Sequence, residues 1–157
     1  MEFIQDVGYE ALAQSAISTV VEDIRGLSKR RPNKRKIADA EEAISWLLNE
    51  CGGYLGYFGL SADAVVEKLT EEGVFVPAIK LVFKEKMARF ANDEAIANSW
   101  RVADKKYMTA RENAKKHVLW MYSREGAVYL KIMGMSPEEA ISRYKKMSED
   151  KAGRVTA

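Results

Sequence analysis

The chain has 157 residues, of which 47% are hydrophobic and 31% are charged, and its formal net charge is +2. This hydrophobic content is typical of a folded globular protein, and the length suits one ordinary domain or two very small domains that pack on each other, so we expect a folded chain. Because the net charge is small, a case for an anionic partner depends on where the charges lie along the chain.

The cysteine content and the N-terminal segment indicate the compartment. Cys51 is the single cysteine, so no intramolecular disulfide can form, and no second thiol or imidazole lies at a metal-binding spacing. The segment from Met1 to Asp6 lacks the basic start and apolar stretch of a signal peptide, and no segment has about 18 consecutive apolar residues. We expect a cytoplasmic protein with no metal, no cofactor and no membrane partner.

Apolar residues at three- and four-residue steps predict the first two helices. The first spans residues 9–27 with a stop near Gly26, and the second spans residues 37–50 and ends at Gly52-Gly53. Pro32 and the mutual repulsion of clustered cations predict an exposed connector between them. The cations of this connector are Lys29, Arg30, Arg31, Lys34, Arg35 and Lys36.

Glycines and helix caps organise the middle of the chain. The glycine-rich segment 52–59 predicts a tight turn, and Ser61 can cap a helix over residues 62–72. Pro77 suits the first position of the next helix. Residues 78–125 contain no Gly or Pro and keep a helical period, which predicts one long helix or two that meet near Asn92-Asp93.

The last predicted helix has a strong start signal. Ser136 and Glu139 form a capping-box pattern, and Pro137 occupies the preferred first helical position. We expect this helix to end near Met147. The sequence therefore predicts a single helical domain over residues 1–150 and a disordered tail over residues 151–157.

Two segments of the chain are similar to each other. A shift of 74 residues aligns Ala40 with Ala114, Trp46 with Trp120 and Gly52 with Gly126, and a shift of 75 aligns Gly59-Leu60-Ser61 with Gly134-Met135-Ser136. Either amphipathic helices match by chance, or one unit of about residues 37–73 is duplicated at about residues 114–147.

Each copy resembles the turn and second helix of a helix-turn-helix. A glycine permits a left-handed turn and a serine caps the next helix, whereas Leu55 and Leu130 replace the usual small alanine. We expect an all-α fold, a compact helical bundle built from two helix-turn-helix-like units joined by a long helix. Tryptophans 46, 100 and 120 then contribute to the core or to a dimer interface, and a homodimer along the long helix fits this pattern.

Residues 11–69 carry a further resemblance. Ala16-Ile17, Val21-Glu22-Asp23-Ile24-Arg25, Trp46-Leu47-Leu48 and Phe58-Gly59-Leu60 resemble an uncharacterised group of small helical proteins of phages and prophages. The resemblance covers under half of the chain. It implies a bacteriophage or mobile-element origin, with the cytoplasm of the host cell as the location, and it transfers no catalytic residues.

No residue pattern predicts catalysis. The single histidine, His117, lies among lysines on a predicted helix, where a surface or rim position is expected. Cys51 lies beside Gly52 and is either an accessible, reactive thiol or, as is more common, a buried cysteine near a helix end. The glycine-rich segment lacks the preceding strand and the following lysine of a phosphate-binding loop. We therefore expect no enzyme.

Basic residues carry the functional hypothesis. The connector cations Lys29, Arg30, Arg31, Lys34, Arg35 and Lys36 can engage phosphates, and Arg143, Lys145 and Lys146 are secondary candidates. A second basic band on the long helix comprises Arg101, Lys105, Lys106, Arg111, Lys115 and Lys116. The leading interpretation is a regulatory, phage-type protein that binds DNA or other nucleic acid. The alternatives are an inhibitor of a host factor or defence system, with a phosphate-mimicking acidic helix at residues 62–72, and an assembly protein of the particle.

Overall fold

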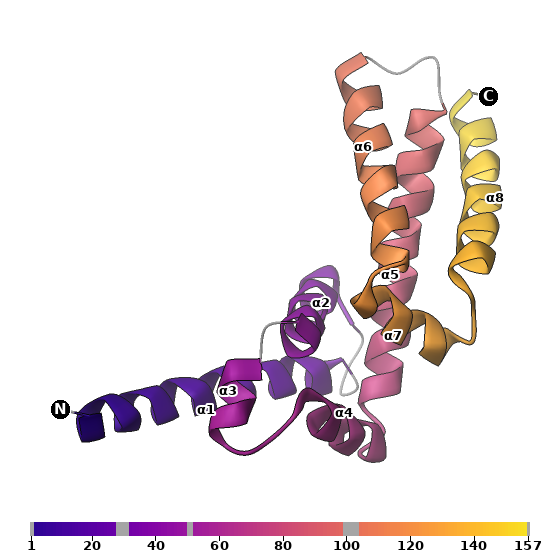
Figure 1. The fold of residues 1–157 in the computed structure, drawn as a ribbon. Coiled ribbons are helices and arrows are strands. Elements are labelled where there is room, and N and C mark those ends of the chain that lie inside the picture. The colour runs from indigo at the N-terminus through magenta and orange to yellow at the C-terminus, as the bar shows by residue number, and fades with distance from the viewer. Residues whose placement is uncertain (1, 28–31, 50–51, 99–103, 157) are drawn as a thin grey trace. The chain divides into compact units, whose positions relative to one another are not determined.

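A computed structural model describes residues 2–27, 32–49, 52–98 and 104–156, and within these ranges it contains eight helices and no strand (Figure 1). The predicted all-α fold is therefore confirmed. The helices are α1 (Glu2–Gly26), α2 (Lys34–Asn49), α3 (Gly52–Tyr57), α4 (Ala62–Glu71), α5 (Phe75–Ala97), α6 (Asp104–Met121), α7 (Arg124–Met133) and α8 (Pro137–Thr156).

The chain forms two compact units, Met1–Val82 and Phe83–Ala157, and the boundary falls inside α5. The single domain expected over residues 1–150 stays a prediction. The order of helices from α1 to α4 recurs from α5 to α8: two longer helices, a short helix, a glycine turn and a serine-capped helix. The repeat thus extends further towards the N-terminus than the sequence predicts, and each unit holds one of the two predicted copies.

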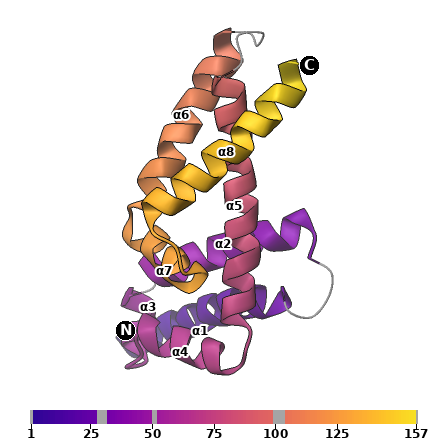
Figure 2. The ribbon, with the colours of Figure 1, turned by 90° about the vertical axis from the view of Figure 1, so that its right-hand side faces the viewer.

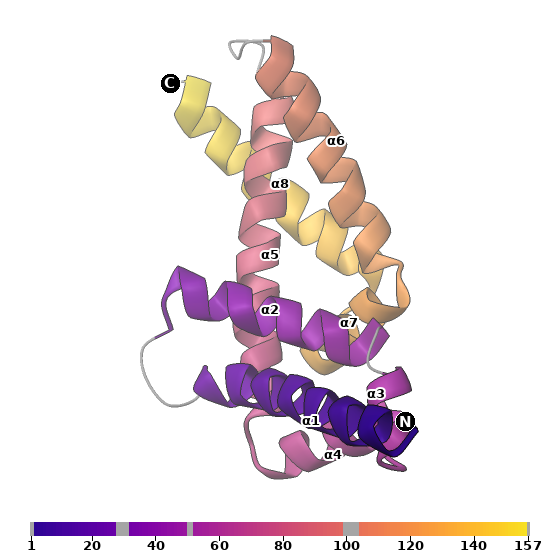
Figure 3. The ribbon, with the colours of Figure 1, turned by 90° about the vertical axis from the view of Figure 1, so that its left-hand side faces the viewer.

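In the first unit, α1 lies against α2 (Figure 3). Ile24 of α1 and Ile44 and Leu47 of α2 are fully or almost fully buried, as expected for residues on the apolar stripes of two amphipathic helices. Arg25 adds a bidentate ion pair, because its guanidinium donates to both carboxylate oxygens of Glu72 at 2.8 and 2.6 Å. This contact joins the end of α1 to the end of α4.

In the second unit, α6 and α8 both pack on the part of α5 that follows Val82 (Figure 2). Phe83 of α5 contacts Tyr144 of α8 edge-to-face at 6.1 Å between ring centroids. Phe90, further along α5, lies 5.8 Å from the ring of His117 on α6. Aromatic side chains therefore fix both neighbours of α5 in this unit.

A similar corner leads to a serine-capped helix in each unit, and Gly73, with φ of 75° and a bond from the Val74 amide to the Leu69 carbonyl at 3.1 Å, repeats the glycine geometry in the first unit. Gly59 and Gly134 both adopt a left-handed conformation with φ of 69°. In both, the next amide donates to a leucine carbonyl five residues back: Leu60 to Leu55 at 2.9 Å, and Met135 to Leu130 at 3.0 Å. The two leucines are buried, so the replacement of alanine that the sequence shows in the helix-turn-helix-like pattern places a large side chain in each core.

Serines cap the helices that follow the two corners, as the sequence predicts. The Ser61 hydroxyl accepts a hydrogen bond from the Ala64 amide at 3.2 Å, and the Ser136 hydroxyl accepts one from the Glu139 amide at 3.1 Å. Each bond satisfies an amide that has no partner within its own helix. The turn, the cap and the buried leucine together set the direction in which α4 and α8 leave their corners.

Several predicted boundaries are wrong. The glycine-rich segment begins with the short helix α3, and α2 begins at Lys34, so part of the predicted connector is helical. The long helix is broken after Ala97, not near Asn92-Asp93, which lies inside α5. This helix starts at Phe75, so Pro77 is its third residue, where the missing amide hydrogen costs no intrahelical bond.

The C-terminal end also differs from the prediction. Helix α8 continues past Met147 to Thr156, so the tail expected to be disordered over residues 151–157 is helical as far as it is described. Ser148, which lies just beyond the predicted helix end, is buried, and its hydroxyl donates to the Lys145 carbonyl. The burial of Ser148 explains why the helix continues past Met147 although the residues that follow are mostly polar.

Among the described glycines, Gly126 has the least space for a side chain, because the backbone at the end of α6 lies against it. A Cβ atom at this position would overlap the Trp120 carbonyl oxygen and would lie 2.9 Å from the Met121 Cα. The Gly126 amide also donates to the Ser123 hydroxyl, which caps α7. Gly126 thus lies inside the first turn of α7 and is a contact point between helices.

We predict that Gly126→Ala destabilises the second unit by about 3 kcal/mol, because the added methyl group would overlap backbone atoms that cannot move independently. Urea unfolding measured by circular dichroism tests this. Gly56→Ala is the control: Gly56 lies in helix α3 with no atom within 4 Å of the place a Cβ would occupy, so alanine there should leave stability unchanged or raise it. Equal effects of the two substitutions would contradict the packing role of Gly126.

Candidate nucleic-acid interface

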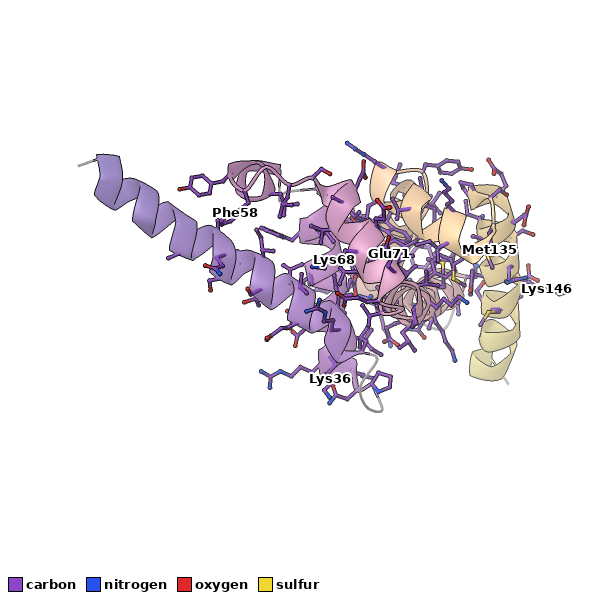
Figure 4. All side chains as sticks on the ribbon, turned by 90° about the horizontal axis from the view of Figure 1, so that it is seen from below. Lys36, Phe58, Lys68, Glu71, Met135 and Lys146 are labelled. Carbon is purple, nitrogen blue, oxygen red and sulfur yellow. The ribbon has the colours of Figure 1, made fainter. Side chains whose placement is uncertain are left out.

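The basic residues predicted near the first connector fall into two groups. Lys29, Arg30 and Arg31 lie outside the described residues. Lys34, Arg35 and Lys36 form the first turn of α2 and are exposed. Within the described ranges none of these three forms an ion pair, and Figure 4 labels Lys36 at this end of α2.

The first turn of α2 places cations where a helix disfavours them. The Asn33 side chain caps the helix by accepting from the Lys36 amide at 2.8 Å, and the first turn has no acidic residue. The free amides at the N-terminus of a helix carry a partial positive charge, which the three cations repel. An anion would be attracted both to these amides and to the cations. The arrangement costs folding stability and suits a bound phosphate.

The predicted cations of α8 do not form one cluster. Arg143, Lys145 and Lys146 are all exposed, but at about 100° per residue they point in different directions around the helix. Arg143 borders a hollow with Glu138 and Glu139, which offset its charge. Figure 4 labels Lys146 on the outer side of α8.

Lys145 instead joins two cations of the second basic band in a groove of the second unit. Arg111 and Lys115 of α6 and Lys145 of α8 line this groove, which has a volume of about 620 Å³. Tyr107, Asn98 and Glu94 contribute to its walls. We call this the cationic groove. The sequence contains each residue, but only the packing of α8 beside α6 brings Lys145 to the other two.

The two units differ in charge. The segment Phe83–Ala157 carries 16 Lys and Arg against ten Asp and Glu, a net charge of +6, whereas Met1–Val82 carries nine against 13, a net charge of −4. The overall value of +2 conceals this division. A long-range attraction for anions therefore belongs to the second unit, which also contains the cationic groove.

Acidic residues gather on the first unit. Asp63, Glu67 and Glu71 are exposed on α4, and Asp23, Asp39 and Glu42 border a groove of about 420 Å³ between α1 and α2. Burial, followed by the charges of Asp39, Glu22 and Glu42, raises the pKa of Asp23. These surfaces would repel a polyanion and would suit a cationic partner.

His117 is not the surface residue that its lysine neighbours suggest. Its Nε2 lies 3.2 Å from a carboxylate oxygen of Asp93, and the side chains of both residues are only 19% exposed. Burial lowers the pKa of His117, the Asp93 carboxylate raises it, and the charges of Lys86 and Arg89 lower it, with a net shift downwards. The pair joins α6 to α5.

No metal site is found within the described ranges, because no group of three or more His, Cys, Asp or Glu side chains converges there. Cys51 lies outside these ranges, as does Trp100, while Trp46 and Trp120 are partly buried. None of the described helices is long and apolar enough to cross a membrane.

Comparison with known proteins adds no relative: no family model matches the chain, and no curated protein or solved structure shows significant similarity to it.

We predict that His117 titrates below the ordinary histidine pKa of about 6.5. Because the folded protein then binds fewer protons than the unfolded chain, stability is full above pH 6.5 and falls as the pH drops below it. NMR titration of the single imidazole tests the pKa directly. Asp93→Asn should lower the pKa further, since the carboxylate favours the charged ring, and a wild-type midpoint above 6.5 would contradict the dominance of burial.

Proposed function

We propose that this protein is a non-enzymatic nucleic-acid-binding protein that holds phosphates in the cationic groove of its second unit. The observation that carries the proposal is the convergence of Arg111, Lys115 and Lys145 from two helices on one groove, in a unit of net charge +6. The resemblance of residues 11–69 to phage proteins supports an origin in a phage or mobile element, and a regulatory role is part of the proposal.

The chemistry of the groove matches a phosphate backbone. Guanidinium groups bind phosphate oxygens through two parallel hydrogen bonds, and ammonium groups act as point charges beside them. Tyr107 in the same groove adds an aromatic ring on which a base could stack. Lys105 lines an adjoining hollow with Arg111 and Lys115 and would extend the contacts along the strand, whereas Lys106 and Lys116 are exposed elsewhere on α6.

The first turn of α2 is a second contact in this proposal. Its exposed cations Lys34, Arg35 and Lys36 accompany a helix N-terminus, which binds phosphates through free amides. The neighbouring Lys29, Arg30 and Arg31 add to the charge of this segment of the sequence. These contacts would go to the backbone and not to base edges, so we expect affinity with little sequence preference from them.

The groove is tested with the double variant Arg111→Gln/Lys145→Gln. We predict that it binds labelled double- and single-stranded DNA and RNA at least about tenfold more weakly at about 0.1 M salt, and that the slope of log affinity against log salt falls by about two. Fluorescence anisotropy at several salt concentrations measures both quantities.

The matched control is Arg124→Gln/Lys131→Gln, which removes the same two residue types from exposed positions of α7 outside the groove. It should change the affinity much less. Equal losses in the two variants would show that total charge, not the groove, determines binding. No binding by the wild type at low salt would overturn the proposal and favour a cationic protein partner for the acidic surfaces of the first unit, as an inhibitor of a host factor would require.

The first turn of α2 has a test of its own. Lys34→Gln/Arg35→Gln/Lys36→Gln should weaken nucleic-acid binding and raise the unfolding temperature of the protein by about 2–4 °C, because the removed cations oppose the helix dipole. Anisotropy and thermal unfolding are measured on the same samples. A variant that is stabilised without any loss of affinity would remove this turn from the interface.

A further inference from the structure

One face of α6 carries large apolar side chains that are mostly exposed, although the Tyr122 hydroxyl at its end donates to Glu138 of α8 at 3.2 Å. Met108 and Leu119 are 59% and 71% exposed, and Tyr122, just beyond the helix end, is 57% exposed. Large apolar side chains at such exposure on one helix are a sign of an interaction surface. They lie on the side of α6 opposite to its buried residues Ala110, Ala114 and Met121.

The spacing of this face is that of a coiled-coil seam. Alternating steps of three and four residues connect its members, and the chain runs far enough for about five turns, roughly 27 Å. The members are Lys105, Met108, Glu112, Lys115, Leu119 and Tyr122, all exposed. We call this the α6 seam.

We propose that the α6 seam pairs with the α6 seam of a second copy of this chain, in an antiparallel arrangement about a two-fold axis between Asn113 and Ala114. In that register Met108 meets Leu119 of the second copy, and Glu112 meets its Lys115. Lys105 meets the aromatic ring of Tyr122, a favourable contact between a cation and a π system. Each of these pairs occurs twice because of the symmetry.

The flanking positions fit the same register. Thr109 faces Lys116 of the second copy, and Arg111 faces its Val118, so no two like charges oppose each other. A parallel pair would instead place Lys105, Glu112 and Lys115 each against its own equivalent, with repulsion at three levels of the seam. Charge therefore selects the antiparallel dimer.

The dimer does not depend on nucleic-acid binding. Lys115 and Leu119 belong to the α6 seam and also line the cationic groove, and Arg111 flanks the seam, so the dimer and a bound phosphate would use overlapping surfaces of α6. The test is therefore made on the full chain without nucleic acid, so that failure of one proposal is distinguishable from failure of the other.

Charge reversal tests the register. Glu112→Lys and Lys115→Glu should each raise the dimer dissociation constant about tenfold, because two attractive pairs become repulsive, and the double variant Glu112→Lys/Lys115→Glu should restore it. Sedimentation equilibrium over a range of concentrations measures the constant, and circular dichroism checks that each variant folds. The inference would be overturned if the wild type stays monomeric at about 0.2 mM, or if neither charge reversal changes the dimer dissociation constant.

Leu119→Asp provides a second measurement. It places a charge opposite Met108 of the second copy and should dissociate the dimer, whereas Lys131→Asp on exposed α7 should leave it intact. Dissociation by both substitutions would show that the interface is not the α6 seam.

Discussion

The structure of each unit depends on one backbone constraint, a left-handed glycine that closes a corner between two helices. At Gly59 and Gly134 the chain can turn because no Cβ opposes a positive φ, and the following amide then reaches the carbonyl of a buried leucine. The serine two residues later then caps the next helix. The glycine turn, the serine cap and the buried leucine therefore act together on the directions of α4 and α8.

In the second unit that direction has a chemical result. With α8 fixed by its corner and by the contact of Tyr144 with Phe83, Lys145 lies beside Arg111 and Lys115 of α6. The His117–Asp93 pair holds α6 to α5 on another side. The cationic groove is therefore formed by packing of three helices, and its charges are held close together by contacts that do not involve the cations themselves.

The sequence predicts the helices well where local signals are strong, and poorly where tertiary contacts decide. Ser61 and Ser136 cap the helices expected of them, because capping depends on a few neighbouring residues. Helix α3 is not predicted because its glycines disfavour a helix, whereas burial of Leu55 favours it. The end of α5 at Ala97 is not predicted, because no Gly or Pro lies near it in the sequence. The grouping of Lys145 with Arg111 is not predicted either, because it depends on contacts between residues far apart in sequence.

The opposite charges of the two units bear on how such a chain can change over time. Few amino acids are tolerated at the glycine, leucine and serine of the corner, because each has a specific structural role there. Exposed positions on the surrounding helices have no such role and tolerate more substitutions. Acidic and basic surfaces can therefore be exchanged on this scaffold without loss of the fold. A chain that uses the unit twice can keep one copy for anions and the other for cations, and mutations that alter recognition by one need not alter the other.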